Sequence, residues 1–359
     1  MDSFTIFIDP DFPVEDVETI ANRLTSLNCL ASGFIPPPVG LLDIAALMYA
    51  ERCDEIETTL IVDRNLASRM AQLAREGAPR KWDRTTEIAV KLMAFAQAMN
   101  LDIEPGLAFH ELAHRDGNAS AQAELSWFRA ADRGAAVKWI DVALGRATKV
   151  DLGPVAEPET HDLAKPLMRW RRNYIVALKI AEPALIGGKA VNSMLALFDW
   201  MIDDFILAGP AAMYAARYFG PLANKGRMMK SMRSNDRERA IAGAKNAAWD
   251  ITYVSEFCRR TRSGEESGRQ YIFASGDQAL IDVASIITCG PEADEDGPSL
   301  LERLCEWWPG REGRVIHDRY LACIERVGNG RNRGTDLTGD PIGEMILQGE
   351  GWLRSWPGK

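Results

Sequence analysis

The stretch TTLIVDRNLASRM, residues 58–70, indicates the fold class. Residues 59–62 form a short apolar, β-branched run of the kind found in buried strands. After Asp63, apolar residues recur at Leu66 and Met70, which is the spacing of one face of a helix. The sequence therefore predicts a buried strand that ends at an aspartate and continues as a helix, the unit from which α/β folds are built.

The stretch IFASGDQAL, residues 272–280, has the same pattern. In an open α/β sheet, functional groups gather at the carboxyl ends of the strands, so we expect Asp63 and Asp277 to lie side by side. Each has a small polar neighbour two positions away, Asn65 in the first stretch and Ser275 in the second. These neighbours can orient the carboxylates by hydrogen bonding.

Two further acids lie on predicted helices between these strands. Glu111 follows a turn at Pro105-Gly106, and Asp250 lies in the helical stretch NAAWDITYVSEF. Four acids from two strand ends and two helices would form a pocket that attracts hard divalent cations, Mg²⁺ or Mn²⁺, through oxygen ligands. The predicted metal ligands are Asp63, Glu111, Asp250 and Asp277.

The order of these residues resembles that of the PIN-domain nucleases. That family has a strand ending in Asp-x-Asn, a glutamate on a helix, an aspartate on a later helix, and a strand ending in Thr or Ser-x-Asp. The matching stretches are LIVDRN, HELA, AAWDITYV and IFASGDQAL. The resemblance implies a three-layer α/β/α fold with a central, mostly parallel sheet, here with a large all-helical insertion.

The resemblance also implies an activity, the metal-dependent hydrolysis of phosphodiester bonds in RNA or in single-stranded DNA. A carboxylate-held Mg²⁺ lowers the pKa of a bound water and neutralises charge that develops in the transition state. Asp63, Asp250 and Asp277 would be ligands, and Glu111 would be a ligand or would position the water. By analogy, a toxin or defence role fits a small nuclease of this kind.

The predicted domain organisation follows the matched stretches. The helical pattern of the middle of the chain is broken at Glu182-Pro183 and at Gly209-Pro210. The expected parts are an N-terminal extension (1–55), a first PIN-like part (56–135), a helical insertion (136–245), a second PIN-like part (246–290) and a C-terminal helical extension (291–359).

A basic stretch precedes the helix of Asp250 and could guide a phosphate backbone to the metal. The alternative is an ordinary solvated surface. Its cations are Lys225, Arg227, Lys230, Arg233, Arg237, Arg239 and Lys245.

The stretch HELAH, residues 110–114, supports a different hypothesis. His110, Glu111 and His114 spell the H-E-x-x-H signature of zinc peptidases, in which two imidazoles one helical turn apart bind zinc beside a glutamate base. Ser120 stands where one subgroup of that class places a third histidine. A third alternative is a non-catalytic interaction protein with a degenerate PIN-like domain, whose helical insertion binds a partner protein or a second copy.

Composition restricts these alternatives. The net charge of −9 over 359 residues excludes nucleic-acid binding by overall charge, so any such contact needs a local patch. Charged residues interrupt the most apolar region, and we therefore expect no membrane span. The six cysteines form no C-x-x-C pair, and no signal-peptide pattern opens the sequence. These features predict a cytoplasmic protein with reduced thiols.

Overall fold

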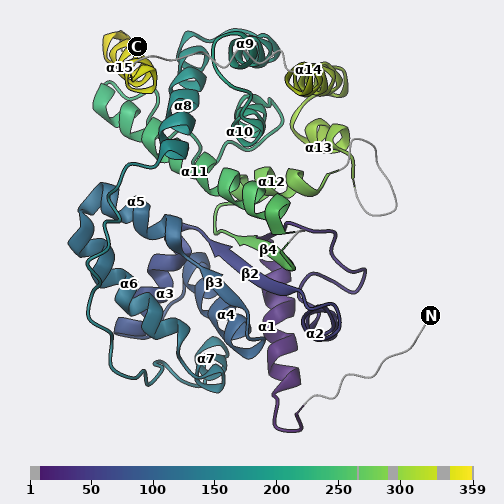
Figure 1. Cartoon of the computed structure of the whole chain (residues 1–359), viewed down its shortest axis with the longest axis vertical. Helices are drawn as coiled ribbons and strands as arrows, with labels where there is room; N and C mark the ends of the chain where they lie inside the picture. Colours follow the sequence, from purple (N-terminus) through teal and green to yellow (C-terminus); the bar gives the residue numbers. More distant parts are fainter. Residues whose placement is uncertain (1–8, 265–266, 290–297, 330–339, 358–359) are drawn as a thin grey trace. The chain divides into compact units, whose positions relative to one another are not determined.

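The computed structural model of the chain describes residues 9–264, 267–289, 298–329 and 340–357 (Figure 1). The protein is a mixed α/β structure with one four-stranded, mostly parallel sheet and many helices in this part of the chain, as the α/β prediction required. It divides into two compact units. The first comprises residues 1–165 and 259–281, and the second comprises residues 166–258 and 282–359.

The sheet belongs to the first unit. Its strands are β1 (Leu30–Ser32), β2 (Glu57–Val62), β3 (Asp102–Glu104) and β4 (Arg269–Ala274), in the order β1-β4-β2-β3. The central strand β2 runs parallel to both β3 and β4, whereas β1 pairs with β4 in the antiparallel sense. Val62 pairs with Ala274, so the parallel strands β2 and β4 end side by side at one edge of the sheet. The strands predicted at 59–62 and in IFASGD are confirmed.

Seven helices, the last turns of α11 and the first turn of α12 complete the first unit within the described residues. They are α1 (Val14–Ser26), α2 (Ile44–Arg52), α3 (Arg64–Glu76), α4 (Arg84–Ala98), α5 (Gly106–Asp116), α6 (Asn118–Asp132) and α7 (Ala136–Ala143). Leu60, Val62 and Ile272 on the sheet share one core with the apolar sides of these helices. Ile61 and Phe273, which alternate with them, are buried as well. Burial of successive residues explains why residues 60–62 of β2 are continuously apolar.

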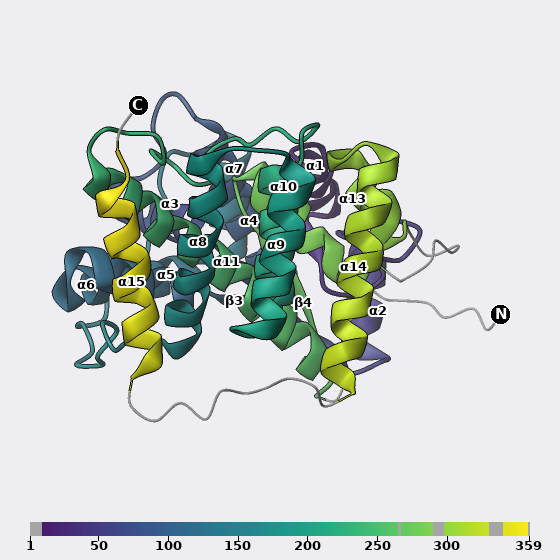
Figure 2. The ribbon, with the colours of Figure 1, turned by 90° about the horizontal axis from the view of Figure 1, so that it is seen from above.

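The second unit is helical, and Figure 2 shows several of its helices running side by side. Two elements, α11 (Arg237–Gly264) and α12 (Gln278–Ala284), contribute residues to both units. The others are α8 (Met168–Ile186), α9 (Ala190–Asp203), α10 (Gly209–Phe219), η1 (Ser285–Thr288), α13 (Leu300–Trp307), α14 (Gly310–Gly328) and α15 (Pro341–Ser355). Within the described ranges, no helix combines the length and the apolar character that crossing a bilayer requires.

The compact units divide the chain at positions other than those we predicted. The predicted N-terminal extension supplies β1 to the sheet and buried residues of α1 and α2 to the first core. Residues 136–165 also belong to the first unit, while residues 246–258 belong to the second. Because α11 is a single helix from Arg237 to Gly264, no local sequence signal marks where one unit ends.

The helix break predicted at Glu182-Pro183 is absent. Helix α8 continues through Pro183 and ends at Ile186, followed by Gly187 with a positive φ of 83°. Pro183 lies in the last turn, so its missing N–H removes only one hydrogen bond near the helix end. The break predicted at Gly209-Pro210 is confirmed, since α10 begins there with a proline in its first turn.

Candidate active site

The candidate site lies where three parallel strands end. Asp63 follows β2 directly, Ser275 and Asp277 follow β4, and Glu104 is the last residue of β3. Because β2 lies between β4 and β3, its terminal aspartate has an acidic strand end on either side. The carboxyl edge of a parallel sheet is where α/β proteins place their functional groups.

Ser275 joins the two predicted aspartates. Its hydroxyl donates to Asp63 Oδ2 over 2.5 Å and accepts a bond from the backbone N–H of Asp277 over 3.0 Å. Ser275 is 1% exposed and Asp63 is 2% exposed, so this contact is shielded from water. The backbone N–H of Ser275 in turn donates to the carbonyl of Cys29, over 3.0 Å. The prediction that Asp63 and Asp277 meet, with Ser275 as the orienting group, agrees with this geometry.

Both aspartates also cap the helices that follow them. Asp63 Oδ1 accepts from the backbone N–H of Leu66 at 2.8 Å, and Asp277 Oδ1 accepts from Ala279 at 2.9 Å. Asn65 is exposed, and its contribution to Asp63 is a backbone hydrogen bond. The hydrogen bond through which Asn65 orients Asp63 is thus made by its main chain.

The surroundings of Asp63 disfavour its charged form. Burial raises the pKa of this carboxyl, and the nearby charge of Asp277 raises it further. The hydrogen bonds from Ser275 and Leu66 act in the opposite direction, because they stabilise the carboxylate. An added cation at this position would remove the repulsion between the two carboxylates.

Sequence reasoning missed Glu104. Its Oε1 accepts from the backbone N–H of Gly106 at 2.8 Å, and its Oε2 lies 3.3 Å from a guanidinium nitrogen of Arg260 in α11. Strand β3 has only three residues, too few for a recognisable strand pattern, so nothing in the local sequence places Glu104 at the edge of the sheet. The parallel pairing of β3 with β2 places it there.

Glu111 lies on α5, the helix that follows β3. It is partly buried and interacts electrostatically with Arg115, one turn later on the same helix. The charge of Arg115 is also felt by Glu124 of α6, which accepts hydrogen bonds from Arg64 and Ser68. Glu111 is thus part of a network of mixed charge among helices α3, α5 and α6.

Asp250 belongs to the second unit. It lies within α11, where its Oδ2 accepts a hydrogen bond of 3.3 Å from the side-chain amide of Asn246. The helical position that the sequence predicted for it is confirmed. The role of Asp250 as a metal ligand is a prediction that variants must decide.

The two histidines of HELAH contact the backbone of residues 163–165. His110 Nδ1 lies 2.7 Å from the carbonyl oxygen of Leu163, and His114 Nε2 lies 3.3 Å from that of Lys165. A carbonyl oxygen only accepts, so these ring nitrogens must carry the protons. The other ring nitrogens are Nε2 of His110 and Nδ1 of His114. The two histidines together anchor residues 163–165 to α5.

The seven basic residues lie on the second unit. Met228, Met229 and Met232 are buried and fix the segment before α11. All of the seven except Arg237 are exposed. Arg239 pairs with Asp236 at 3.5 Å, and Lys245 pairs with Glu350 at 3.3 Å. In the described segment, exposed cations therefore lie over buried apolar side chains. Both a solvated surface and an anion-binding surface would have this arrangement.

In the described part of the chain, no group of three or more His, Cys, Asp or Glu side chains could hold a metal ion. Mg²⁺, however, commonly keeps several waters and binds proteins through only one or two carboxylates together with substrate phosphates. Two repelling carboxylates, one of them buried, offer the oxygen donors that such an ion needs.

Comparisons with known protein families, with curated proteins and with solved structures find no match for this chain.

Proposed function

We propose that the first unit is a PIN-like nuclease domain that hydrolyses phosphodiester bonds of RNA, or of single-stranded DNA, with Mg²⁺ or Mn²⁺. The observation that carries this proposal is the link from Asp63 through Ser275 to Asp277 at the ends of two adjacent parallel strands. The strand order β4-β2-β3, with an aspartate after the central strand, is compatible with such a domain.

In this mechanism Asp63 and Asp277 would hold the cation, which would supply positive charge toward the scissile phosphate and the attacking water. Ser275 fixes the Asp63 carboxylate and orders the backbone ahead of Asp277. The Leu66 N–H, at the start of α3, holds the other Asp63 oxygen. These bonds position both acids before substrate arrives, which limits the reorganisation needed during reaction.

Two further acids are candidates for completing the site. Glu104 stands at the end of the neighbouring strand, held by Gly106 and Arg260. Glu111 has the position on a helix that the resemblance assigns to a metal ligand or a water-positioning group. The basic residues 225–245 are proposed to contact the phosphate backbone.

The test measures metal binding and RNA cleavage on the same preparations. Isothermal titration with MgCl₂ and MnCl₂ gives affinity and stoichiometry, and a fluorogenic single-stranded RNA gives activity. Asp277→Asn keeps an oxygen that can accept from Ala279 but removes the charge, so metal binding and cleavage should fall at least about 100-fold. Asp250→Asn and Glu111→Gln decide whether those acids belong to the site.

The matched control is Asp54→Asn, the same change at an exposed position in the turn before β2. It should retain full activity, as should His114→Ala. Cleavage that survives Asp277→Asn, or a folded wild type that neither binds Mg²⁺ or Mn²⁺ nor cleaves RNA or single-stranded DNA, would refute the nuclease. Stoichiometric zinc that disappears with His114→Ala would support the peptidase instead.

A further inference from the structure

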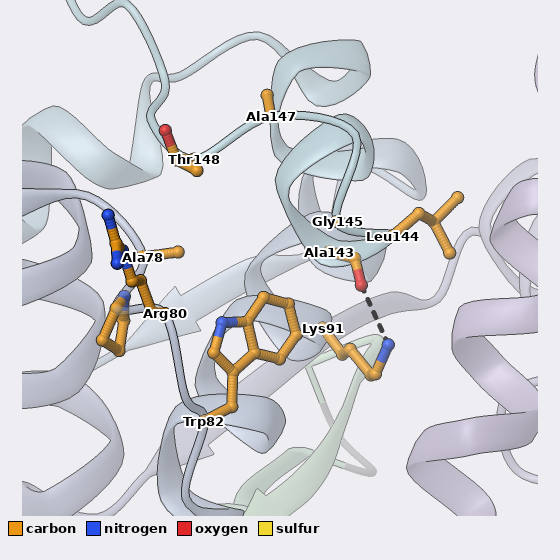
Figure 3. Close-up of a pocket in the computed structure, with 10 residues that line it drawn as sticks. Ala78, Arg80, Trp82, Lys91, Ala143, Leu144, Gly145, Ala147 and Thr148 are labelled. Atoms are coloured by element: carbon orange, nitrogen blue, oxygen red, sulfur yellow. Dashed lines mark hydrogen bonds between the residues drawn. The ribbon is translucent and has the colours of Figure 1, made fainter.

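A cavity of about 500 Å³ lies in the first unit, and none of the acids of the candidate active site lines it (Figure 3). One wall is the connection between α3 and α4, including Arg80 and Trp82, and another is the turn after α7, residues 143–148. Lys91 of α4 completes the lining. The turn is fixed to the connection by a bond from the backbone N–H of Ala78 to the carbonyl of Thr148, at 2.7 Å.

Lys91 is a buried cation whose charge is only partly compensated. The residue is 8% exposed, and its ammonium donates to the carbonyl oxygen of Ala143 at 2.9 Å. It also lies 5.9 Å from the centre of the Trp82 ring. The acid that acts on it, Glu87, is bound by Arg23 through bonds of 2.7 and 3.0 Å. Burial accordingly lowers the pKa of Lys91, and a bound anion would reverse that effect.

The other lining groups complement this cation. Figure 3 shows the Trp82 indole in the middle of the lining, between Arg80 and Lys91. The indole is partly exposed, so part of a flat aromatic surface can be reached by a ligand. Arg80 is exposed and forms no ion pair within the described residues, and the hydroxyl of Thr148 lies on the rim. One aromatic face thus combines with a guanidinium and an ammonium.

We infer that this cavity binds a planar aromatic anion of about the size of a nucleoside monophosphate. The ring would stack on Trp82, and the negative group would take hydrogen bonds from Arg80, while Lys91 on the other side of the indole adds positive charge. Pockets for ligands of this size commonly enclose about 300–1,000 Å³ and combine apolar walls with a few polar groups. A small inorganic anion would leave most of the volume empty. This site is independent of the proposed metal site.

A purely structural role for Lys91 is the rival explanation. Its ammonium caps the last carbonyl of α7, a favourable place for a cation at a helix C-terminus. That role explains Lys91, but it gives no function to Arg80 or to the accessible face of Trp82. Variants of these two residues therefore separate ligand binding from helix capping.

The experiment is isothermal titration of the full chain in the presence of EDTA, which excludes any contribution from a metal site. The probes are AMP, UMP, 2-naphthoate and inorganic phosphate, each in a separate arm. At least one aromatic probe should bind more tightly than phosphate. Arg80→Ala and Trp82→Leu should each weaken that binding by about tenfold or more, which corresponds to the loss of one good contact.

The control is Lys81→Ala, which removes a neighbouring exposed cation outside the lining and should leave affinity unchanged. A preference for AMP or UMP over 2-naphthoate identifies a nucleotide site, and the reverse identifies a site for another aromatic acid. The inference is overturned if no aromatic probe binds wild type, or if Arg80→Ala and Trp82→Leu bind as wild type does. Binding of phosphate as tight as that of every aromatic probe also overturns it.

Discussion

The hydroxyl of Ser275 donates a 2.5 Å hydrogen bond to Asp63, a residue 212 positions earlier in the chain. The bond connects the ends of β2 and β4, the two longest strands of the described sheet. It also keeps a buried carboxylate beside a second one, an arrangement that burial and charge repulsion both oppose. A positive charge beside the two carboxylates would offset that repulsion.

Replacing Ser275 by alanine should destabilise the protein by about 1–3 kcal/mol, because a buried carboxylate oxygen loses its partner. Without the hydroxyl, the pKa of Asp63 should rise further, and Mg²⁺ should bind more weakly. Urea unfolding with and without Mg²⁺ measures both effects. Ser120→Ala, an exposed change on α6, should alter the free energy of unfolding by less than about 0.5 kcal/mol. Equal effects of the two substitutions would contradict the role given to Ser275.

Replacing Asp63 by asparagine should raise the stability of the protein and lower its activity. The pKa of Asp63 is raised on folding, so its contribution to stability is complete below the unfolded pKa and is lost as pH rises through the folded pKa. At neutral pH without divalent cations, Asp63→Asn should therefore unfold at a higher urea concentration than wild type. Cleavage should drop by at least about 100-fold.

Added Mg²⁺ provides the control for that variant. A ligand that binds only the folded state stabilises it by mass action, so Mg²⁺ should raise the unfolding midpoint of wild type and of Asp54→Asn. The midpoint of Asp63→Asn should stay constant as Mg²⁺ is added. A variant that is stabilised by Mg²⁺ as strongly as wild type would show that Asp63 is not a ligand.

The raised pKa of Asp132, the last residue of α6, predicts a second pH dependence of stability, outside the candidate active site. Burial raises its pKa to about 6, the charge of Asp102 adds to the effect, and the amide of Gln97 opposes it from 3.1 Å. Stability from the protonated form is thus lost as pH rises through about 6. Asp132→Asn should add on the order of 1–2 kcal/mol at about pH 8 and nothing at about pH 3, after allowance for partial solvent exposure. A gain independent of pH would contradict the shift.

The pairing of Asp63 with Asp277 could be predicted because it depends on local signals and one general rule. Each aspartate follows a strongly apolar strand and precedes a helix, and parallel strands place their carboxyl ends at one edge. Glu104 and β1 could not be predicted in this way. Strands β1 and β3 have three residues each, and only pairing with longer neighbours identifies them as strands.

The helical acids show a different limit. The sequence correctly placed Glu111 and Asp250 on helices, but the direction in which a helix presents a side chain depends on packing with no local signature. Glu111 participates in interactions with Arg115, and Asp250 accepts from Asn246, one turn earlier on its helix. A spacing such as H-E-x-x-H is equally ambiguous, since two imidazoles one turn apart can bind a metal or two backbone carbonyls.

His110→Ala tests that ambiguity. The loss of the bond to Leu163 should cost about 1 kcal/mol and loosen residues 163–165, while RNA cleavage stays within about twofold of wild type. Limited proteolysis of the 163–165 segment and a metal assay of the purified protein measure the two effects. His161→Ala, an exposed histidine close by in sequence, serves as the control. One zinc per chain in wild type, absent from the variant, would restore the peptidase hypothesis.

Gly243 of α11 lies against the basic segment. Its replacement by alanine should change the free energy of unfolding in the direction opposite to the usual one. A Cβ at this position would lie 1.8 Å from the carbonyl oxygen of Lys230, a backbone atom that cannot move aside easily. Glycine to alanine normally stabilises a helix interior by about 0.5–1 kcal/mol, and Gly351→Ala in α15, where the space is open, should do so. Gly243→Ala should instead destabilise by about 2 kcal/mol or more, because the Lys230 backbone is displaced.

If the exposed cations of that segment contact RNA, the same variant should also weaken RNA binding measured by fluorescence anisotropy, whereas Gly351→Ala should not. A stabilising Gly243→Ala would show that the segment does not pack on α11 in solution.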